Sequence, residues 1–178
     1  MTRVIAGERK GLNLYNPKGK QIRPTTDRVK EWIFSVAGPL FNFQVLDLYC
    51  GAGNLGIEAL SRGAESCVFV DKSKTSLQLT QRNIERAQYS EKSDIIRNDC
   101  LKYLQTTQSL FDLVFADPPY NYRATPELIT SVKDVLIDSG KFIFEAKEEY
   151  SGELPEGLTK QRTKKLGTTT ITIFGKTL

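Results

Sequence analysis

The chain has 178 residues, long enough to bury a sizeable core and short enough for a single domain. Hydrophobic residues make up 39% of it and charged residues 26%, proportions that exclude fibrous and disordered classes. The net charge is +4 and there is no histidine. Catalysis by Ser-His-Asp or Cys-His groups and histidine-ligated metal sites are therefore excluded, and we expect no bound metal.

The short apolar runs and the cysteine spacing indicate the cellular compartment. No apolar run approaches the roughly 20 residues of a membrane-spanning helix, and the N-terminal stretch has no apolar signal-peptide core. The three cysteines, Cys50, Cys67 and Cys100, are widely spaced and include no C-x-x-C pair. We therefore expect a cytoplasmic protein with reduced thiols in its core.

The predicted elements begin with a hairpin of residues 4–6 and 12–15. A helix follows, with Thr26 as its N-cap and with Gly38 and Pro39 at its end. Strands and helices then alternate, with strands predicted at 45–49, 67–70, 94–97, 113–116 and 141–146 and helices at 55–62, 74–88, 101–105 and 126–137. Two further strands meet at Gly167.

This alternation predicts an α/β fold of the Rossmann-like kind. Its sheet should be mostly parallel, covered by helices and closed by a C-terminal antiparallel hairpin. We expect one domain over residues 1–178, in which a small N-terminal hairpin and helix (1–38) precede the catalytic α/β core (44–178).

Positive charge is concentrated in the N-terminal arm. Residues 1–31 contain eight basic and three acidic residues, so the arm carries +5 and the remainder −1. Such a run is often only a solvated face, but it is also a candidate contact for a polyanion. The candidate phosphate contacts are Arg9, Lys10 and Arg23. A second basic cluster near the C-terminus contains Lys160, Arg162, Lys164 and Lys165.

A glycine-rich loop follows the first strand of the core. Gly51, Gly53 and Gly56 fit G-x-G-x-x-G, and Asp71 follows Gly51 by 20 residues, the fingerprint of a dinucleotide site. Asp47 argues against a pyrophosphate there, because a carboxylate close to the loop would repel it. S-adenosylmethionine carries an ammonium and a sulfonium and no phosphate. It therefore suits this loop, with Asp71 at its ribose hydroxyls.

The segment Asp117, Pro118, Pro119 and Tyr120 follows the predicted buried strand 113–116, at the edge where open α/β sheets bind ligands. Asp117 and the Pro118 carbonyl can accept the two N–H groups of an exocyclic base amine, and the proline rings fix where that carbonyl points. Tyr120 offers a face for an unpaired base. The pattern indicates methyl transfer to a base amine, which requires no histidine.

Three further acids each have two interpretations. Asp99 follows strand 94–97, where it can reach the adenine amino group or cap the next helix. Glu58 and Glu145 can be charges of an active cleft, but solvated or ion-paired acids are the favoured interpretation.

These motifs resemble the amino-methylating enzymes with a D/N-P-P-Y/F/W motif, and more closely the RsmD-type guanine-N2 methyltransferases of bacterial small-subunit ribosomal RNA. The resemblance rests on RVIAGERKG, IRPTTDRVKEWIF, DLYCGAGNLGIEALSRGA, FADPPY and GTTTITIFGK. It implies the sheet of a class I S-adenosylmethionine-dependent methyltransferase. The substrate would be 16S rRNA, in the small ribosomal subunit or an assembly intermediate. We also expect a monomer.

The resemblance also implies roles for residues. The cofactor would be bound by Asp47, Gly51, Gly53 and Asp71, with Asp99 at its adenine. The target base would be held by residues 117–120. The substrate would be bordered by Arg23, Thr25, Asp27 and Arg28.

Three alternatives remain open. N6 methylation of adenine in DNA or RNA would use the same amine chemistry. An NAD-dependent oxidoreductase would use the glycine loop but is opposed by Asp47. An RNA-binding module without catalysis is opposed by the intact segment 117–120.

Overall fold

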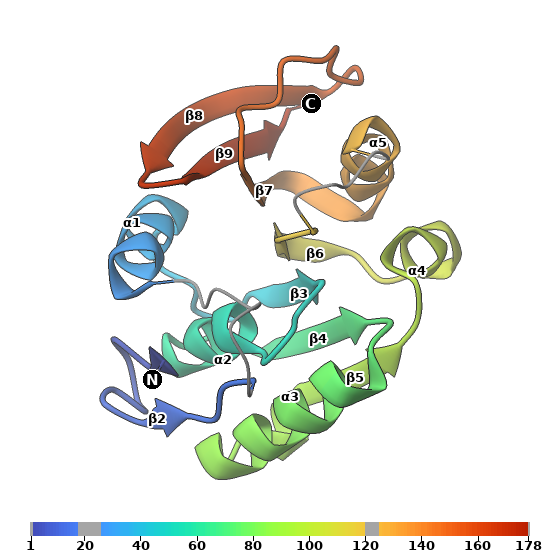
Figure 1. Ribbon diagram of the computed structural model, residues 1–178. Helices are drawn as coiled ribbons and strands as arrows, with labels where there is room; N and C mark the ends of the chain where they lie inside the picture. Colours follow the sequence, from blue (N-terminus) through green and yellow to red (C-terminus); the bar gives the residue numbers. More distant parts are fainter. Residues whose placement is uncertain (1, 18–25, 120–124, 178) are drawn as a thin grey trace.

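The computed structural model describes residues 2–17, 26–119 and 125–177 (Figure 1). Within these residues the core is a seven-stranded sheet of order β5-β4-β3-β6-β7-β9-β8. Its strands are β3 (Gln44–Leu48), β4 (Ser66–Asp71), β5 (Ser93–Arg97), β6 (Phe111–Ala116), β7 (Leu136–Ala146), β8 (Leu158–Leu166) and β9 (Thr169–Lys176). Strands β3 to β7 pair in parallel, and β9 is antiparallel to both β7 and β8. The predicted α/β fold is confirmed.

Helices cover both faces of the sheet (Figure 1). They are α1 (Asp27–Ala37), α2 (Asn54–Ser61), α3 (Lys74–Ala87), α4 (Cys100–Thr106) and α5 (Thr125–Val135), with a short 3₁₀ turn η1 (Ser90–Lys92). Successive strand residues face opposite sides, so Val45 packs with α1, α2 and α3 while Leu46 packs with α4 and α5. No helix in the described ranges is long and apolar enough to cross a membrane.

The predicted ends of α1 are confirmed. The hydroxyl of Thr26 accepts a hydrogen bond from the Val29 amide at 3.4 Å, the geometry of an N-cap. Gly38 ends the helix with φ of 81°, a conformation that glycine adopts without strain.

The N-terminal hairpin is present, but its predicted strand bounds are wrong. Strands β1 (Thr2–Arg3) and β2 (Asn13–Leu14) are only two residues long each. The amides of Ile5 and Ala6 donate instead to the Glu58 carboxylate, at 2.9 and 3.0 Å. The Glu58 carboxylate of α2 thus takes the backbone amides that the sequence pattern assigned to the first strand of the hairpin, and the strand ends early.

The boundary between α5 and β7 also differs from the prediction. Helix α5 ends at Val135, and β7 begins at Leu136, where the pattern placed its start at Lys141. Leu136 pairs with Phe111, and the register then shifts before Lys141 pairs with Leu113. β7 is longer than predicted because its first residues pair with β6. The periodicity of the local sequence carries no information about such pairing.

Candidate active site

The glycine loop joins β3 to α2 at the carboxyl edge of the sheet. Gly51 and Gly53 have φ of 56° and 77°, and Gly53 is the N-cap of α2. A side chain at Gly56 is excluded, because a Cβ there would lie 2.3 Å from the ring of Phe69 on β4. The third glycine therefore lets α2 pack closely on the sheet.

Asp47 lies beneath this loop. It is 3% exposed, and its Oδ2 accepts a hydrogen bond from the Gly56 amide at 2.9 Å. Burial raises the pKa of Asp47 to about 7, opposed by that amide and reinforced by Asp71. Its described contact fastens the first turn of α2 to β3, and the expected contact with a cofactor stays a prediction.

Asp71, at the end of β4, contacts the loop from the other side. Its Oδ2 accepts from the Gly51 amide at 3.1 Å and its Oδ1 from the Ser73 amide at 2.8 Å. Each carboxylate oxygen has a second lone pair for a ligand hydroxyl. The glycine loop and the acid that follows Gly51 by 20 residues are therefore in contact in the structure.

Asp99 adopts the capping role that was one of its two interpretations. Its Oδ1 accepts from the amides of Leu101 and Lys102 at 3.0 and 3.2 Å, as the N-cap of α4. The side chain is exposed near the end of β5. A contact with adenine stays a prediction.

Asp117 and Glu145 come together at the ends of β6 and β7. Ala116 pairs with Phe144, so the following residues are neighbours on adjacent parallel strands. Asp117 is half-buried, and Glu145 is only 7% exposed, so the solvated interpretation of Glu145 is wrong. Burial, Glu145 and Asp47 raise the pKa of Asp117 well above its ordinary value. We call Asp47, Asp117 and Glu145 the carboxylate cluster.

The prolines of the motif continue from this cluster. Pro118 is buried and Pro119 is exposed, so the chain turns outward at this point. Tyr120 lies outside the described residues, as do Arg23 and Thr25. A cavity of about 740 Å³ opens beside the end of β7, lined in part by Phe144 and Ala146.

Glu58 is far more constrained than the sequence indicated. It is fully buried, with salt bridges to Lys30 of α1 at 3.5 Å and to Arg62 at 2.9 Å. Lys30 is also fully buried and donates to the Arg3 carbonyl. The ion-paired interpretation of Glu58 is confirmed, and the pair joins α1, α2 and the hairpin. The burial of Lys30 had no sequence signal beyond its place in an otherwise apolar helix face.

The basic residues predicted to contact the substrate differ in their surroundings. Arg9 donates to the Ala87 carbonyl and the Gln88 side chain, both at 2.9 Å, and lies over the Tyr89 ring. These contacts fasten the hairpin to the end of α3, and the binding of phosphate by Arg9 stays a prediction. Lys10 and Arg28 are exposed, and their predicted role is open to test.

Two further expectations can be compared with the structure. Cys50, Cys67 and Cys100 are buried free thiols, as expected. Asp27, expected at the substrate border, pairs with Arg3 at 3.0 Å and thereby links α1 to the hairpin.

Comparison with known proteins gives consistent matches. The family model described as Conserved hypothetical protein 95 matches residues 2–175. The Bacillus subtilis (strain 168) protein YlbH is 37% identical, over 98% of this chain and 98% of its own. Ribosomal RNA small subunit methyltransferase D of Escherichia coli (strain K12) is 30% identical, over 88% of this chain and 77% of its own. The solved Escherichia coli protein yhhF superposes with a TM-score of 0.88 at 26% identity, covering 98% and 97% of the two chains.

Proposed function

The chain belongs to the family described as Conserved hypothetical protein 95, and we propose that it transfers a methyl group from S-adenosylmethionine to the N2 amine of a guanine in 16S ribosomal RNA. Family membership confirms the resemblance that the sequence motifs indicated. Relatives named Ribosomal RNA small subunit methyltransferase D support ribosomal RNA as the substrate. That the enzyme is a cytoplasmic monomer acting on the small ribosomal subunit or on an assembly intermediate of it is part of the same proposal.

One observation carries the proposal. The glycine loop with Asp71 and the segment beginning at Asp117 follow β3, β4 and β6, which are neighbours in the sheet. A cofactor on the loop and an amine at Asp117 would therefore meet at one edge.

The loop fits S-adenosylmethionine on its own chemistry. A Cβ at Gly51 would have only the Tyr49 carbonyl near it, at 3.9 Å, so the loop leaves open space on this side. The neighbouring charged groups, Asp47 and Asp71, are acids, which suit an ammonium and ribose hydroxyls and disfavour a pyrophosphate. When bound, S-adenosylmethionine supplies a methyl group activated by its sulfonium.

Asp117 would act on the amine. A base amine is a weak nucleophile, and a carboxylate that accepts one of its N–H groups raises the electron density on nitrogen. The Pro118 carbonyl would accept the second N–H. As the N–C bond forms and the C–S bond breaks, nitrogen must lose a proton, and the raised pKa of Asp117 makes its carboxylate a better acceptor. Glu145 would act through Asp117, as a positioning residue.

The test is methylation of small ribosomal subunits from a strain that lacks the gene. Purified protein with S-adenosylmethionine should form N2-methylguanosine in 16S rRNA, and the Asp117→Ala protein should form it at least about a hundred-fold more slowly. Nucleoside analysis that finds N6-methyladenosine instead would overturn the proposed target. A thermal shift with NAD and none with S-adenosylhomocysteine would overturn the reaction class.

A further inference from the structure

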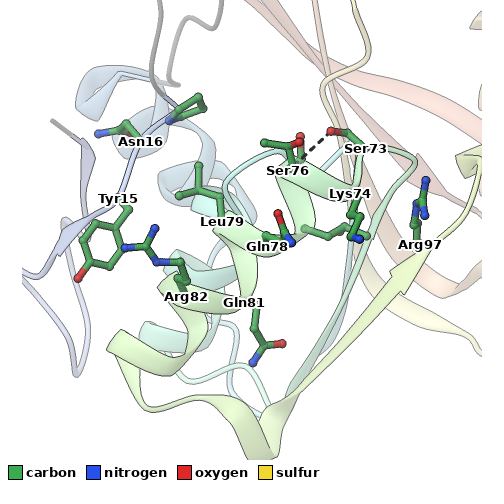
Figure 2. A pocket seen from close by; sticks show the side chains of 13 residues that line it. Tyr15, Asn16, Ser73, Lys74, Ser76, Gln78, Leu79, Gln81, Arg82 and Arg97 are labelled. Carbon is green, nitrogen blue, oxygen red and sulfur yellow. Dashed lines mark hydrogen bonds between the residues drawn. The ribbon is translucent and has the colours of Figure 1, made fainter.

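A groove runs along the outer side of α3 (Figure 2). No residue of the carboxylate cluster lines it. It has a volume of about 1070 Å³ and lies between α3 and the segment that leaves the N-terminal hairpin. We call it the α3 groove. Tyr15 and Arg82 lie at one end in Figure 2, with Lys74 and Arg97 toward the other.

The charge of the groove has one sign. Among the described residues that line it are three cations, Lys74, Arg82 and Arg97, and no carboxylate. All three cations are exposed, and the remaining polar lining consists of hydroxyl and amide groups. Such a lining attracts an anion and offers neutral donors and acceptors beside it.

The first turn of α3 strengthens this charge. The helix begins at Lys74 after the N-cap Ser73, and its first turn contains no acid. A helix N-terminus carries partial positive charge, which an acid would stabilise and which Lys74 increases. The sequence therefore places a cation where helix stability alone favours an anion.

Tyr15, on the hairpin side of the groove, is hydrogen-bonded to α3. The buried Asn83 side chain accepts from the Tyr15 amide at 2.7 Å and donates to the carbonyls of Tyr15 and Ala52. Arg82 and Arg86 lie over the Tyr15 ring, with 4.6 and 5.2 Å from each guanidinium carbon to the ring centroid. Of these two, Arg82 lines the groove, and its stacking on Tyr15 favours one arrangement of the guanidinium, which lowers the entropy lost on binding.

The groove also connects to the proposed active site. Ser73 lines the groove, and its amide donates to Asp71, which in turn binds the amide of Gly51 in the glycine loop. A ligand in the groove would therefore extend away from the cofactor loop along α3. Lys74 and Arg82 are eight residues apart, about 12 Å along the helix.

We propose that the α3 groove binds an unpaired strand of the RNA substrate, with its phosphates on Lys74, Arg82 and Arg97. An extended strand has the negative charge and the hydroxyl groups that this lining complements. The inference rests on the proposed function, because it takes the substrate to be RNA. An acidic segment of a ribosomal protein is the competing occupant.

The test compares a groove variant, Lys74→Ala with Arg82→Ala and Arg97→Ala, with a control variant, Lys92→Ala with Lys102→Ala and Lys133→Ala. Binding of a single-stranded fragment of 16S rRNA is measured over a salt series. Three lost phosphate contacts should flatten the log–log slope by about 2, at roughly 0.7 per contact, which is roughly a hundred-fold in affinity at 0.1 M salt. The control variant should keep the wild-type slope, and both should keep the wild-type affinity for S-adenosylhomocysteine.

Equal slopes for the groove variant and the wild type would overturn the inference. Weaker binding to intact subunits with unchanged binding to naked RNA would also overturn it, in favour of a protein partner. If the groove variant has a lower unfolding midpoint, the single variants Lys74→Ala and Arg97→Ala replace it, each expected to flatten the slope by about 0.7. A wild-type protein that methylates no RNA would instead refute the proposed function, which the methylation assay measures separately.

Discussion

The buried pair of Lys30 and Glu58 makes a sharp prediction about stability. The Glu58→Gln variant keeps the side-chain shape but removes the buried carboxylate that pairs with Lys30, leaving only the partly exposed Asp27 carboxylate at 4.0 Å. In the wild type, the Glu58 carboxylate accepts hydrogen bonds from two backbone amides and from Arg62. The NH₂ group of the introduced glutamine would therefore point toward hydrogen-bond donors, with which it cannot bond. Breaking one partner of a buried pair costs about 3 to 5 kcal/mol of unfolding free energy. For a chain of this size the melting temperature should fall by roughly 6 to 20 °C.

The pH dependence distinguishes this cause from a simple packing defect. Burial already lowers the pKa of Lys30, although Glu58 and Asp27 oppose it. With Glu58 neutralised, folded Lys30 should bind its proton less tightly than unfolded lysine does. The unfolded state then binds more protons, so the stability of the variant should rise with pH toward the ordinary lysine pKa.

Chemical denaturation of the wild type, Glu58→Gln and the exposed control Glu65→Gln, at neutral and alkaline pH, measures both effects. The control should match the wild type within about 0.5 kcal/mol. A loss below about 1 kcal/mol for Glu58→Gln would refute the reasoning, since it would mean that water reaches Lys30. A deficit that does not shrink at alkaline pH would refute the assignment to the lysine charge.

Three further predictions concern the active site. Asp71→Ala should weaken S-adenosylhomocysteine by roughly ten- to a hundred-fold in calorimetry, because a charged acceptor worth about 1.5 to 3 kcal/mol is lost, while RNA affinity is retained. Asp117→Ala should slow single-turnover methylation at least about a hundred-fold with cofactor affinity nearly intact. Glu145→Gln should move the acid limb of the pH–rate profile to lower pH, because a charge that raises the pKa of Asp117 is removed; the exposed Glu148→Gln should leave it unchanged.

Each of these three predictions has an outcome that would contradict it. Unchanged calorimetry would remove Asp71 from the cofactor site. A fall of less than tenfold in the single-turnover rate would mean that Asp117 is not the amine acceptor. An acid limb that stays in place in Glu145→Gln would show that the charge of Glu145 does not contribute to the raised pKa of Asp117.

The sequence by itself determined the order of the helices and strands, the mostly parallel sheet and the two motifs at its edge. These features depend on residues close together in the chain, such as the period of apolar residues and the spacing of Gly51, Gly53 and Gly56. The Thr26 cap and the Gly38 end of α1 are equally local. Local patterns therefore predicted them.

Only the tertiary structure decided which distant residues share a site. The hairpin strands are short because Glu58 takes the amides of Ile5 and Ala6, more than 50 positions away. Glu145 lies beside Asp117 because β6 and β7 pair in one register, and Arg9 contacts the end of α3 because the hairpin packs there. Burial, charge pairing and pKa depend on neighbours in space, and those neighbours are set by strand register and helix packing rather than by spacing along the chain.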